Sequence, residues 1–578
     1  MSAPSPVQLA VNIAHCTIVT DGQQLPSTVQ LVSVEIWSGV NKVPRARIVV
    51  SDGSAAEEDF PISDSTSLIP GASITVSMGY ASSSSTVFTG VIYRQGLEAS
   101  TNGPSRLVVE ACDQALVMTL ARHNALFENV TDSQVCQQLI QANGLSAKVS
   151  ATSTVHEAIV QYYASDWDLL VLRAQASSMV VITDAGEVSV AQPDTSAAPV
   201  LTLKYGESLL DFRANMDAST QFNASAIQSV AWDPATQSLA KSSQPQANIS
   251  TPGNISSAQL AQVFKVKSLL QQTPGAMQTT ELTQWSSAEL MMSQLAKIRG
   301  EARFQGSALA KPGCMVTLQG LGSRFNGNAY VSGVHHRYHE GLWRTTVEIG
   351  MSAQWFAATT PHVAAPGASG QLPPANNLQS GTVQQIDQDP DGEFRVLVIL
   401  PLLQAPAQHG VWARFGSFYA SNGVGSCFYP EVGDEVVVAF LGGDPRYPVI
   451  LGSLYSKKNP PPVVPDKANN LKSIVSRAKL HIDFDEESPA ITLITPQKQS
   501  VVINDKEKSI KLTDMNGNSV TLNSSGIEVK SAKDITLSAG GAINVTAQST
   551  LSAKGTNSAQ ISSSGTVQIS GATVALNP

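Results

Sequence analysis

Acidic residues gather in one short stretch of the sequence, PEVGDEVVVAFLGGDP, at positions 430–445. Glu431, Asp434, Glu435 and Asp444 lie at the ends of two segments that alternate like strands. A glycosidase needs two carboxylates that converge on a cleft, one of them with a raised pKa. Asp and Gly are also the residues that satisfy backbone groups in tight turns. The stretch carries no sign of burial, so it predicts turns at strand ends.

A second group of reactive side chains is His335-His336-Arg337-Tyr338-His339-Glu340. On a helix, His335 and His339 would share a face and could bind one metal ion. The flanking pattern is typical of a strand, in which four residues span roughly 13 Å, too far for two ligands of one ion. We expect His335, Arg337 and His339 on one face and His336 on the other, in a structural role.

The remaining candidates for chemistry are equally modest. Asp168 follows Ser165 at the spacing of a capping box, which favours a helix start over a catalytic acid. The five cysteines are odd in number and form no CxxC pair, so we expect them to be reduced: Cys16, Cys112, Cys136, Cys314 and Cys427. No nucleophile, zinc or phosphate-binding motif is found. The sequence therefore predicts no catalytic residue, no metal site and no cofactor.

Charge and hydropathy limit the partners and the location. The formal net charge is −9, and we find no cluster of Lys and Arg beyond the pair Lys457–Lys458. Nucleic acid is therefore not an expected partner. No apolar run approaches the ~20 residues of a membrane-spanning helix. The N-terminus lacks the pattern of a signal peptide, so we expect synthesis in the cytoplasm and release, if any, without a cleaved signal.

The chain of 578 residues is long enough for three or four domains, and its many Gly, Ser, Thr and Val residues predict a mainly β fold with a few helices. Helices are expected from Thr131, from Ser165 and after Ser286. Residues 234–280 show weak periodicity and predict a long irregular excursion. The expected boundaries are a hub domain over 1–365, a linker over 366–378, a barrel over 379–456, a proline-rich linker over 457–470 and a spike over 471–578.

The region before the second linker predicts a small closed barrel. Five strand-like segments follow one another within about 75 residues, which suits a barrel of the oligonucleotide/oligosaccharide-binding (OB) type. The segments are 381–387, 394–401, 410–416, 434–440 and 448–455.

The last part of the chain holds the clearest internal repeat. Apolar residues come as i, i+2 pairs, each pair eight residues after the one before, with Ser, Thr, Asn, Gly and Lys between them. Ala553 and Ala559 complete two of the pairs. The expected core residues of the repeat are Ile527, Val529, Ile535, Leu537, Ile543, Val545, Leu551, Ile561, Val567 and Ile569.

An i, i+2 pair puts two side chains on one face of a short strand, and one such strand cannot make a core. Three chains wound around a common axis would bring the apolar pairs together and would pair the open backbone edges. The repeat therefore predicts an intertwined trimeric β-prism or β-helix. A monomeric β-helix and a disordered Ser/Gly tail are the competing interpretations.

The barrel region resembles the VgrG / phage baseplate hub–spike family. Phe394 and the bulky pair Phe428-Tyr429 depart from the family pattern. The matching residues are Gly381, Val383, Asp389-Pro390-Asp391-Gly392, Arg395, Val396, Leu400-Pro401, Trp412, Arg414, Pro430-Glu431-Val432-Gly433-Asp434-Glu435-Val436, Gly443-Asp444-Pro445, Pro448 and Gly452-Ser453-Leu454-Tyr455.

The N-terminal half resembles the phage late-control protein and hub, with two barrel subdomains. The residues that carry this are Val43-Pro44-Arg45-Ala46, Asp52-Gly53, Pro70-Gly71, Gly79-Tyr80, Phe88-Thr89-Gly90, Ser165-Asp166-Trp167-Asp168, Pro312-Gly313, Tyr330-Val331 and His336. The eight-residue repeats, called octads below, resemble the spike prism of the same family.

The resemblance implies a structural homotrimer at the tip of a contractile injection system. Its hub would join the inner tube and the baseplate proteins, and its spike would pierce the target membrane transiently. A PAAR-type tip protein would cap the end, with contacts expected at Val574, Leu576 and Pro578. An extracellular, phage-tail-like particle is favoured over a type VI secretion spike. A cell-wall-degrading, lysozyme-like enzyme and a carbohydrate- or nucleic-acid-binding module are less favoured hypotheses.

Overall fold

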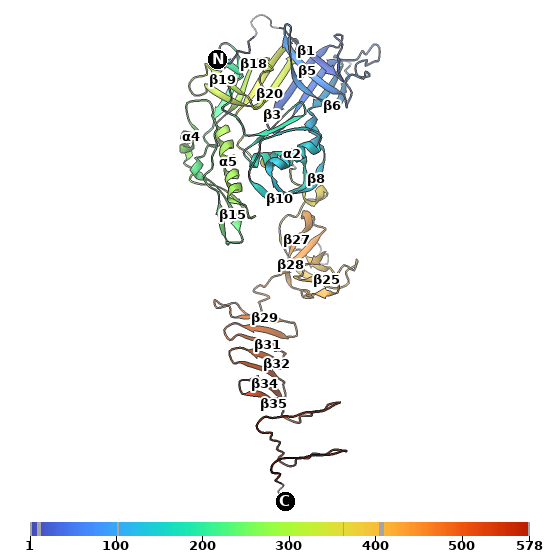
Figure 1. Cartoon of the computed structure of the whole chain (residues 1–578). Coiled ribbons are helices and arrows are strands. Elements are labelled where there is room, and N and C mark those ends of the chain that lie inside the picture. The colour runs from blue at the N-terminus through green and yellow to red at the C-terminus, as the bar shows by residue number, and fades with distance from the viewer. Residues whose placement is uncertain (1–2, 8–12, 101–102, 362, 404–409, 576–578) are drawn as a thin grey trace. The chain divides into compact units, whose positions relative to one another are not determined.

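The structure is a computed structural model that describes residues 3–7, 13–100, 103–361, 363–403 and 410–575 (Figure 1). The chain divides into two compact units, Met1–Pro373 and Pro374–Pro578. Strands dominate both units, so the prediction of a mainly β fold is confirmed. Within the described ranges, every helix is too short or too polar to cross a bilayer.

The first unit is built around one large sheet. Its first part runs in the order β3-β4-β7-β6-β5-β1-β2. Alternate residues of these strands, among them Val34, Ile36, Ile48 and Val109, are fully buried in one core. The strands are β1 (Ala14–Thr20), β2 (Gln23–Gln24), β3 (Leu31–Gly39), β4 (Lys42–Ser51), β5 (Ser73–Tyr80), β6 (Ser83–Glu98) and β7 (Arg106–Cys112).

A second group of strands continues the same sheet and encloses a separate core. The strands are β13 (Leu201–Lys204), β14 (Leu209–Met216), β18 (Ile298–Gln305), β19 (Met315–Gln319), β20 (Gly327–His339) and β21 (Leu342–Ile349). The sheet continues as β14-β18-β21-β20-β3. Antiparallel pairing of β20 with β3, from Gly333↔Gly39 to His339↔Ser33, joins the two groups.

A helical subdomain lies between these groups in the sequence. It contains α1 (Val117–Leu120), β8 (Arg122–Thr131), α2 (Asp132–Ala142), β9 (Ser146–Val149), β10 (Val155–Ser165), α3 (Asp166–Ala176), β11 (Val180–Asp184) and β12 (Glu187–Ala191). The helix start predicted at Thr131 is confirmed, and Thr131 and Gln134 form a capping box there. Ser165 caps α3 by accepting a hydrogen bond from the backbone N–H of Asp168 at 3.1 Å. Both helices begin where the sequence places their caps.

The expectation of an irregular excursion over 234–280 is wrong. This part of the chain holds β16 (Ser238–Lys241), α4 (Ser257–Phe264), β17 (Leu269–Thr273) and the start of α5 (Thr279–Leu295), and β15 (Ile227–Asp233) directly precedes it. Helix α5 begins well before Ser286, after which the sequence predicts it. Ser286 and Ser293 are buried on this helix, so polar residues interrupt the apolar stripe that would have marked it.

The predicted five-stranded barrel is confirmed. Strands β22 (Gln379–Gln385), β23 (Val396–Ile399), β24 (Val411–Phe415), β27 (Glu435–Phe440) and β28 (Pro448–Ser453) close on one another. A short hairpin of β25 (Ala420–Ser421) and β26 (Val424–Gly425) follows β24. The barrel core is made of small and β-branched residues, among them Val383, Val398, Val436 and Ile450. They fill the narrow interior of the barrel. Because the barrel is closed, none of its five strands is an edge strand.

The C-terminal region begins with a sheet of seven strands, which Figure 1 shows as a stack from β29 to β35. They are β29 (Leu471–Val475), β30 (His481–Asp485), β31 (Ala490–Ile494), β32 (Ser500–Asn504), β33 (Ser509–Thr513), β34 (Ser519–Asn523) and β35 (Gly526–Lys530). Each strand pairs antiparallel with the next. An octad repeat therefore does not describe this part, which is a meander of hairpins within one chain.

Candidate functional site, an uncovered apolar sheet face

The acidic residues of the 430–445 stretch act in turns and ion pairs, as the sequence predicts. Asp434 accepts a hydrogen bond from the backbone N–H of Glu431 at 2.9 Å, and Glu431 pairs with Arg477 at 2.8 Å. Asp444 pairs with Arg446 at 2.7 Å, and this hydrogen bond lowers the pKa of the Asp444 carboxyl. Asp444 is thus held in its charged form, unlike a general acid, which needs a raised pKa.

The histidine cluster lies on strand β20, and its faces alternate as predicted. His335 stacks on Trp37 with ring centroids 4.9 Å apart, whereas His336 points into the core and hydrogen-bonds to Thr345 at 2.9 Å. Burial lowers the pKa of His336 to about 3, so it stays neutral. In the described part of the chain, no group of three or more His, Cys, Asp or Glu residues is placed to hold a metal ion.

A buried charged network in the first unit has no counterpart among the sequence predictions. Asp132, only 1% exposed, binds Arg173 at 2.6 Å, Ser177 at 2.5 Å and His156 at 3.2 Å. The other ring nitrogen of His156 lies 3.3 Å from Glu281 of α5. Burial acts to raise the pKa of the Asp132 carboxyl, but the bonds from His156, Arg173 and Ser177 lower it to about 2. The network ties α2, β10 and α3 to α5, and no local motif in the sequence signals it.

The C-terminal sheet has one face made almost wholly of apolar side chains. Residues in direct register fall into two columns across the strands. One column is Ile474, Ile482, Leu493, Val501, Leu512, Val520 and Val529, and the other is Phe484, Ile491, Ile503, Ile510, Leu522 and Ile527. The octad pattern in the sequence reaches only Ile527 and Val529 of this sheet, with less regular pairs at Ile510/Leu512 and Val520/Leu522, because the apolar pairs of the sheet are not eight residues apart.

The opposite face of the sheet is polar. Its central column is Ser473, Asp483, Thr492, Val502, Lys511, Thr521 and Glu528. A sheet with one apolar and one polar face normally packs the apolar face on a second layer.

Among the residues that the structure describes, none forms a second layer over the apolar face. Ile482, Phe484, Leu493 and Ile503 are each about two-fifths exposed. A hollow of about 1610 Å³ runs along this face, lined by strand residues and by the segment that follows the barrel hairpin, including Cys427, Phe428 and Tyr429. An exposed apolar surface that continues over seven strands marks an interaction site.

The octad residues continue the apolar pairs beyond this sheet. Ile527 and Val529 lie in β35, and no strand is described from residue 531 to 575. The strand expected in each octad is therefore absent from the single chain. Every remaining core residue predicted for the repeat is exposed, from 46% for Val567 to 78% for Ile561: Ile535, Leu537, Ile543, Val545, Leu551, Ile561, Val567 and Ile569. Two apolar side chains per octad cannot close a core within one chain.

The residues expected to contact a tip protein lie at the end of this run. Val574 is half exposed. Leu576 and Pro578 lie outside the described residues.

Two family models match the sequence. One, described as the Alg8 N-terminal domain, matches residues 10–340, which is more than half of the chain. The other, described as the type VI secretion system/phage-baseplate injector OB domain, matches residues 379–455. The second match coincides with the closed barrel.

Curated relatives match over short segments. The type VI secretion system spike protein VgrG4b of Pseudomonas aeruginosa is 41% identical over 59 residues, which are 10% of this chain and 7% of that protein. VgrG1a of the same organism is 33% identical over 86 residues, 14% of this chain and 13% of that protein. The matched parts thus span 7% and 13% of these two relatives.

Solved structures with a similar course of the chain include phage tail proteins. The 43 kDa tail protein of prophage MuSo2 from Shewanella oneidensis is 11% identical, with a TM-score of 0.45, over 59% of this chain and 99% of that chain. The tail protein from Neisseria meningitidis MC58 is 13% identical, with a TM-score of 0.44, over 59% of this chain and 98% of that chain.

The buried network predicts a pH dependence for the stability of the first unit. Hydrogen bonds to Asp132 and Glu281 raise the pKa of His156 to about 9 from 6.5, against the effect of burial. The stabilisation by protonated His156 is complete below pH 6.5 and is lost as the pH rises through 9. We expect the free energy of unfolding to fall by about 2–3 kcal/mol over this interval.

Calorimetry from about pH 6 to about pH 10 on the protein and on His156→Gln checks this prediction. The variant should be less stable at neutral pH and should show a flatter profile. Parallel profiles for the two proteins would mean that His156 does not carry the dependence.

Proposed function

Because the chain belongs to the family of VgrG and phage-baseplate spike proteins, with an Alg8 N-terminal domain ahead of its injector barrel, we propose that it is the hub and spike of a contractile injection system. The observation that carries the proposal is the apolar face of the C-terminal sheet, continued by the octads. A spike of this kind delivers itself and its cargo into a target cell. The work comes from the contracting apparatus, and the chain transmits the load.

The apolar face supports a trimer. Burying one Val, Leu or Ile side chain contributes about 1.5–3 kcal/mol, and the two columns of this face hold twelve such side chains. Three copies around one axis would turn three apolar faces inward and leave three polar faces outside. The edge strands β29 and β35 and the unpaired octads then find backbone partners in neighbouring copies. The result is a stiff shaft with a polar surface.

The hub is proposed to be the end that receives the inner tube. Two strand groups with separate cores share one sheet through β20 and β3. A trimer would therefore present six related strand groups and match a six-fold tube. Baseplate proteins are proposed as further partners of this part, which encloses two buried cores of its own.

The opposite end is proposed to carry a PAAR-type tip protein, with Val574, Leu576 and Pro578 in contact with it. The chain itself is proposed to be non-enzymatic and to need no cofactor. The ion pairs of Glu431 and Asp444 support this, because both carboxylates are already engaged by arginines. An extracellular, phage-tail-like particle remains favoured. A type VI secretion spike is the alternative.

Light scattering on the purified chain tests the proposal. The full-length chain should have a mass about three times its 60.8 kDa, and a chain truncated after Tyr455 should lose part or all of this association. A full-length monomer at micromolar concentration would contradict the trimeric spike. Release of fragments from purified peptidoglycan by the full-length chain would instead support a cell-wall-degrading enzyme.

A charge placed in the middle of the octads tests the inward-facing residues. Val545→Glu would bring three carboxylates to one axis, at a cost of several kcal/mol per trimer. The trimer should dissociate in detergent at a lower temperature than the unchanged protein. The matched control is Asn544→Glu, which adds the same charge on the polar side and should leave the dissociation temperature nearly unchanged. Equal effects of the two substitutions would show that Val545 does not face the axis.

A further inference from the structure

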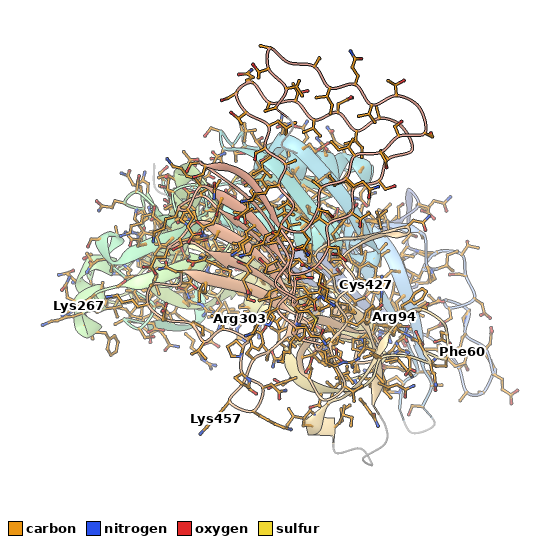
Figure 2. The ribbon with its side chains drawn as sticks, turned by 90° about the horizontal axis from the view of Figure 1, so that it is seen from below. Phe60, Arg94, Lys267, Arg303, Cys427 and Lys457 are labelled. Atoms are coloured by element: carbon orange, nitrogen blue, oxygen red, sulfur yellow. The ribbon has the colours of Figure 1, made fainter. Side chains whose placement is uncertain are left out.

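Arginines that are scattered along the sequence meet on one face of the large sheet. Eight neighbouring strands from β14 to β6 place them on the side that faces away from the two cores. Figure 2 labels two of them, Arg94 of β6 and Arg303 of β18. We define the arginine face by Arg45, Arg47, Arg94, Arg213, Arg299, Arg303, Arg337 and Arg344. In a chain with a net charge of −9, this is a local concentration of positive charge.

The register sets these side chains side by side. One row crosses six strands in the order Arg344, Arg337, Glu35, Arg47, Glu110 and Arg94, each directly opposite the next. Arg344 and Arg337 are like charges in direct opposition, an arrangement that destabilises a sheet on its own. An anionic partner would remove that repulsion.

Only part of the positive charge is neutralised within the chain. Arg303 pairs with Asp211 at 2.8 Å, Arg337 with Glu35 at 3.5 Å, Arg94 with Glu110 at 3.5 Å and Arg47 with Glu98 at 3.9 Å. In the described part of the chain, no ion pair or hydrogen bond engages the guanidinium groups of Arg213, Arg299 and Arg344. These three side chains are exposed, and their planar guanidinium groups suit a carboxylate partner.

An aromatic stack fixes the centre of the arginine face. The guanidinium of Arg45 lies 5.0 Å from the ring of Trp37, whose other neighbour is the parallel ring of His335 at 4.9 Å. Burial lowers the pKa of His335, so its ring is neutral at pH 7 and adds no charge. Arg45 is therefore oriented in advance, which reduces the entropy lost when it binds a carboxylate.

We propose that the arginine face binds an acidic polypeptide segment. Arg pairs with carboxylates through two parallel hydrogen bonds, and an extended segment presents alternate side chains to one side. A nucleic acid fits less well, because every nucleotide carries a phosphate and would meet the acids of the same face. These acids are Glu35, Glu98, Glu110, Asp211, Glu301 and Glu348. A polypeptide can leave uncharged side chains at those positions. The proposal rests on the first unit alone and does not depend on the trimeric spike.

Fluorescence anisotropy on the full-length protein tests the proposal. The probes are a labelled peptide of about twelve residues that alternates Glu and Thr, a matched peptide of Lys and Thr, and a single-stranded oligonucleotide of similar length. The Glu peptide should bind best, and its affinity should fall as salt is added. Tighter binding of the oligonucleotide than of the Glu peptide would mean that the face prefers a nucleic acid, which overturns the proposal. Failure of the Glu peptide to bind would also overturn it.

Matched variants locate the binding. Arg45→Gln, Arg299→Gln and Arg344→Gln combined should weaken binding of the Glu peptide by about tenfold or more, as expected for the loss of several charged contacts. The control combines Arg414→Gln, Lys267→Gln and Lys457→Gln, which removes as many charges elsewhere and should change the affinity by less than about twofold. The double variant Arg299→Gln with Arg344→Gln leaves the stack of Arg45 on Trp37 intact and should also weaken binding of the Glu peptide.

Equal losses in the arginine-face variant and the control would overturn the proposal. Light scattering is run on the same samples. If the arginine-face variant alone has a smaller mass than the unchanged protein, the face is a contact between copies of this chain, which also overturns the proposal.

Discussion

The C-terminal region depends on one constraint, which is that its apolar side chains must be covered. These side chains recur at i and i+2, and no second layer within the described residues covers them. Across seven strands the register puts every such pair on the same face, and the octads extend the pattern beyond the sheet. One chain cannot fold these residues into a core, because a flat sheet and isolated octads have nothing to pack against. The proposed trimer would supply the missing core of this region, whereas the first unit and the barrel complete their cores within the chain.

The barrel and the large sheet bury their apolar side chains within one chain. The barrel closes on itself, so its residues Val383 and Val436 are buried without a partner. The large sheet encloses two separate cores and joins them through β20 and β3, which turns the two strand groups into one continuous surface. That surface carries the arginine face, and the buried network around Asp132 fixes the helical subdomain to α5. Each part thus has its own source of stability.

Local patterns in the sequence are sufficient to predict some elements and not others. The helix starts at Thr131 and Ser165 and the barrel strands are predicted correctly because cap spacing and period-2 alternation are short-range signals. The sequence predicts helix α5 too late, since Ser286 and Ser293 interrupt its stripe. The octad spacing does not reveal the meander of β29 to β35, whose hairpins differ in length. The sequence does not predict the arginine face, because its residues are spread from position 45 to position 344. Only the pairing of the strands brings them together.

Hydrogen exchange of the octad amides tests the central claim most directly. In the single chain, no strand is described from residue 531 to 575, so any protection of these amides must come from pairing between copies. The account predicts slow exchange throughout this run in the full-length protein, comparable to exchange in the barrel strands. Exchange at the rate of an unstructured chain, with the barrel still protected, would contradict the account and leave the octads as a disordered tail.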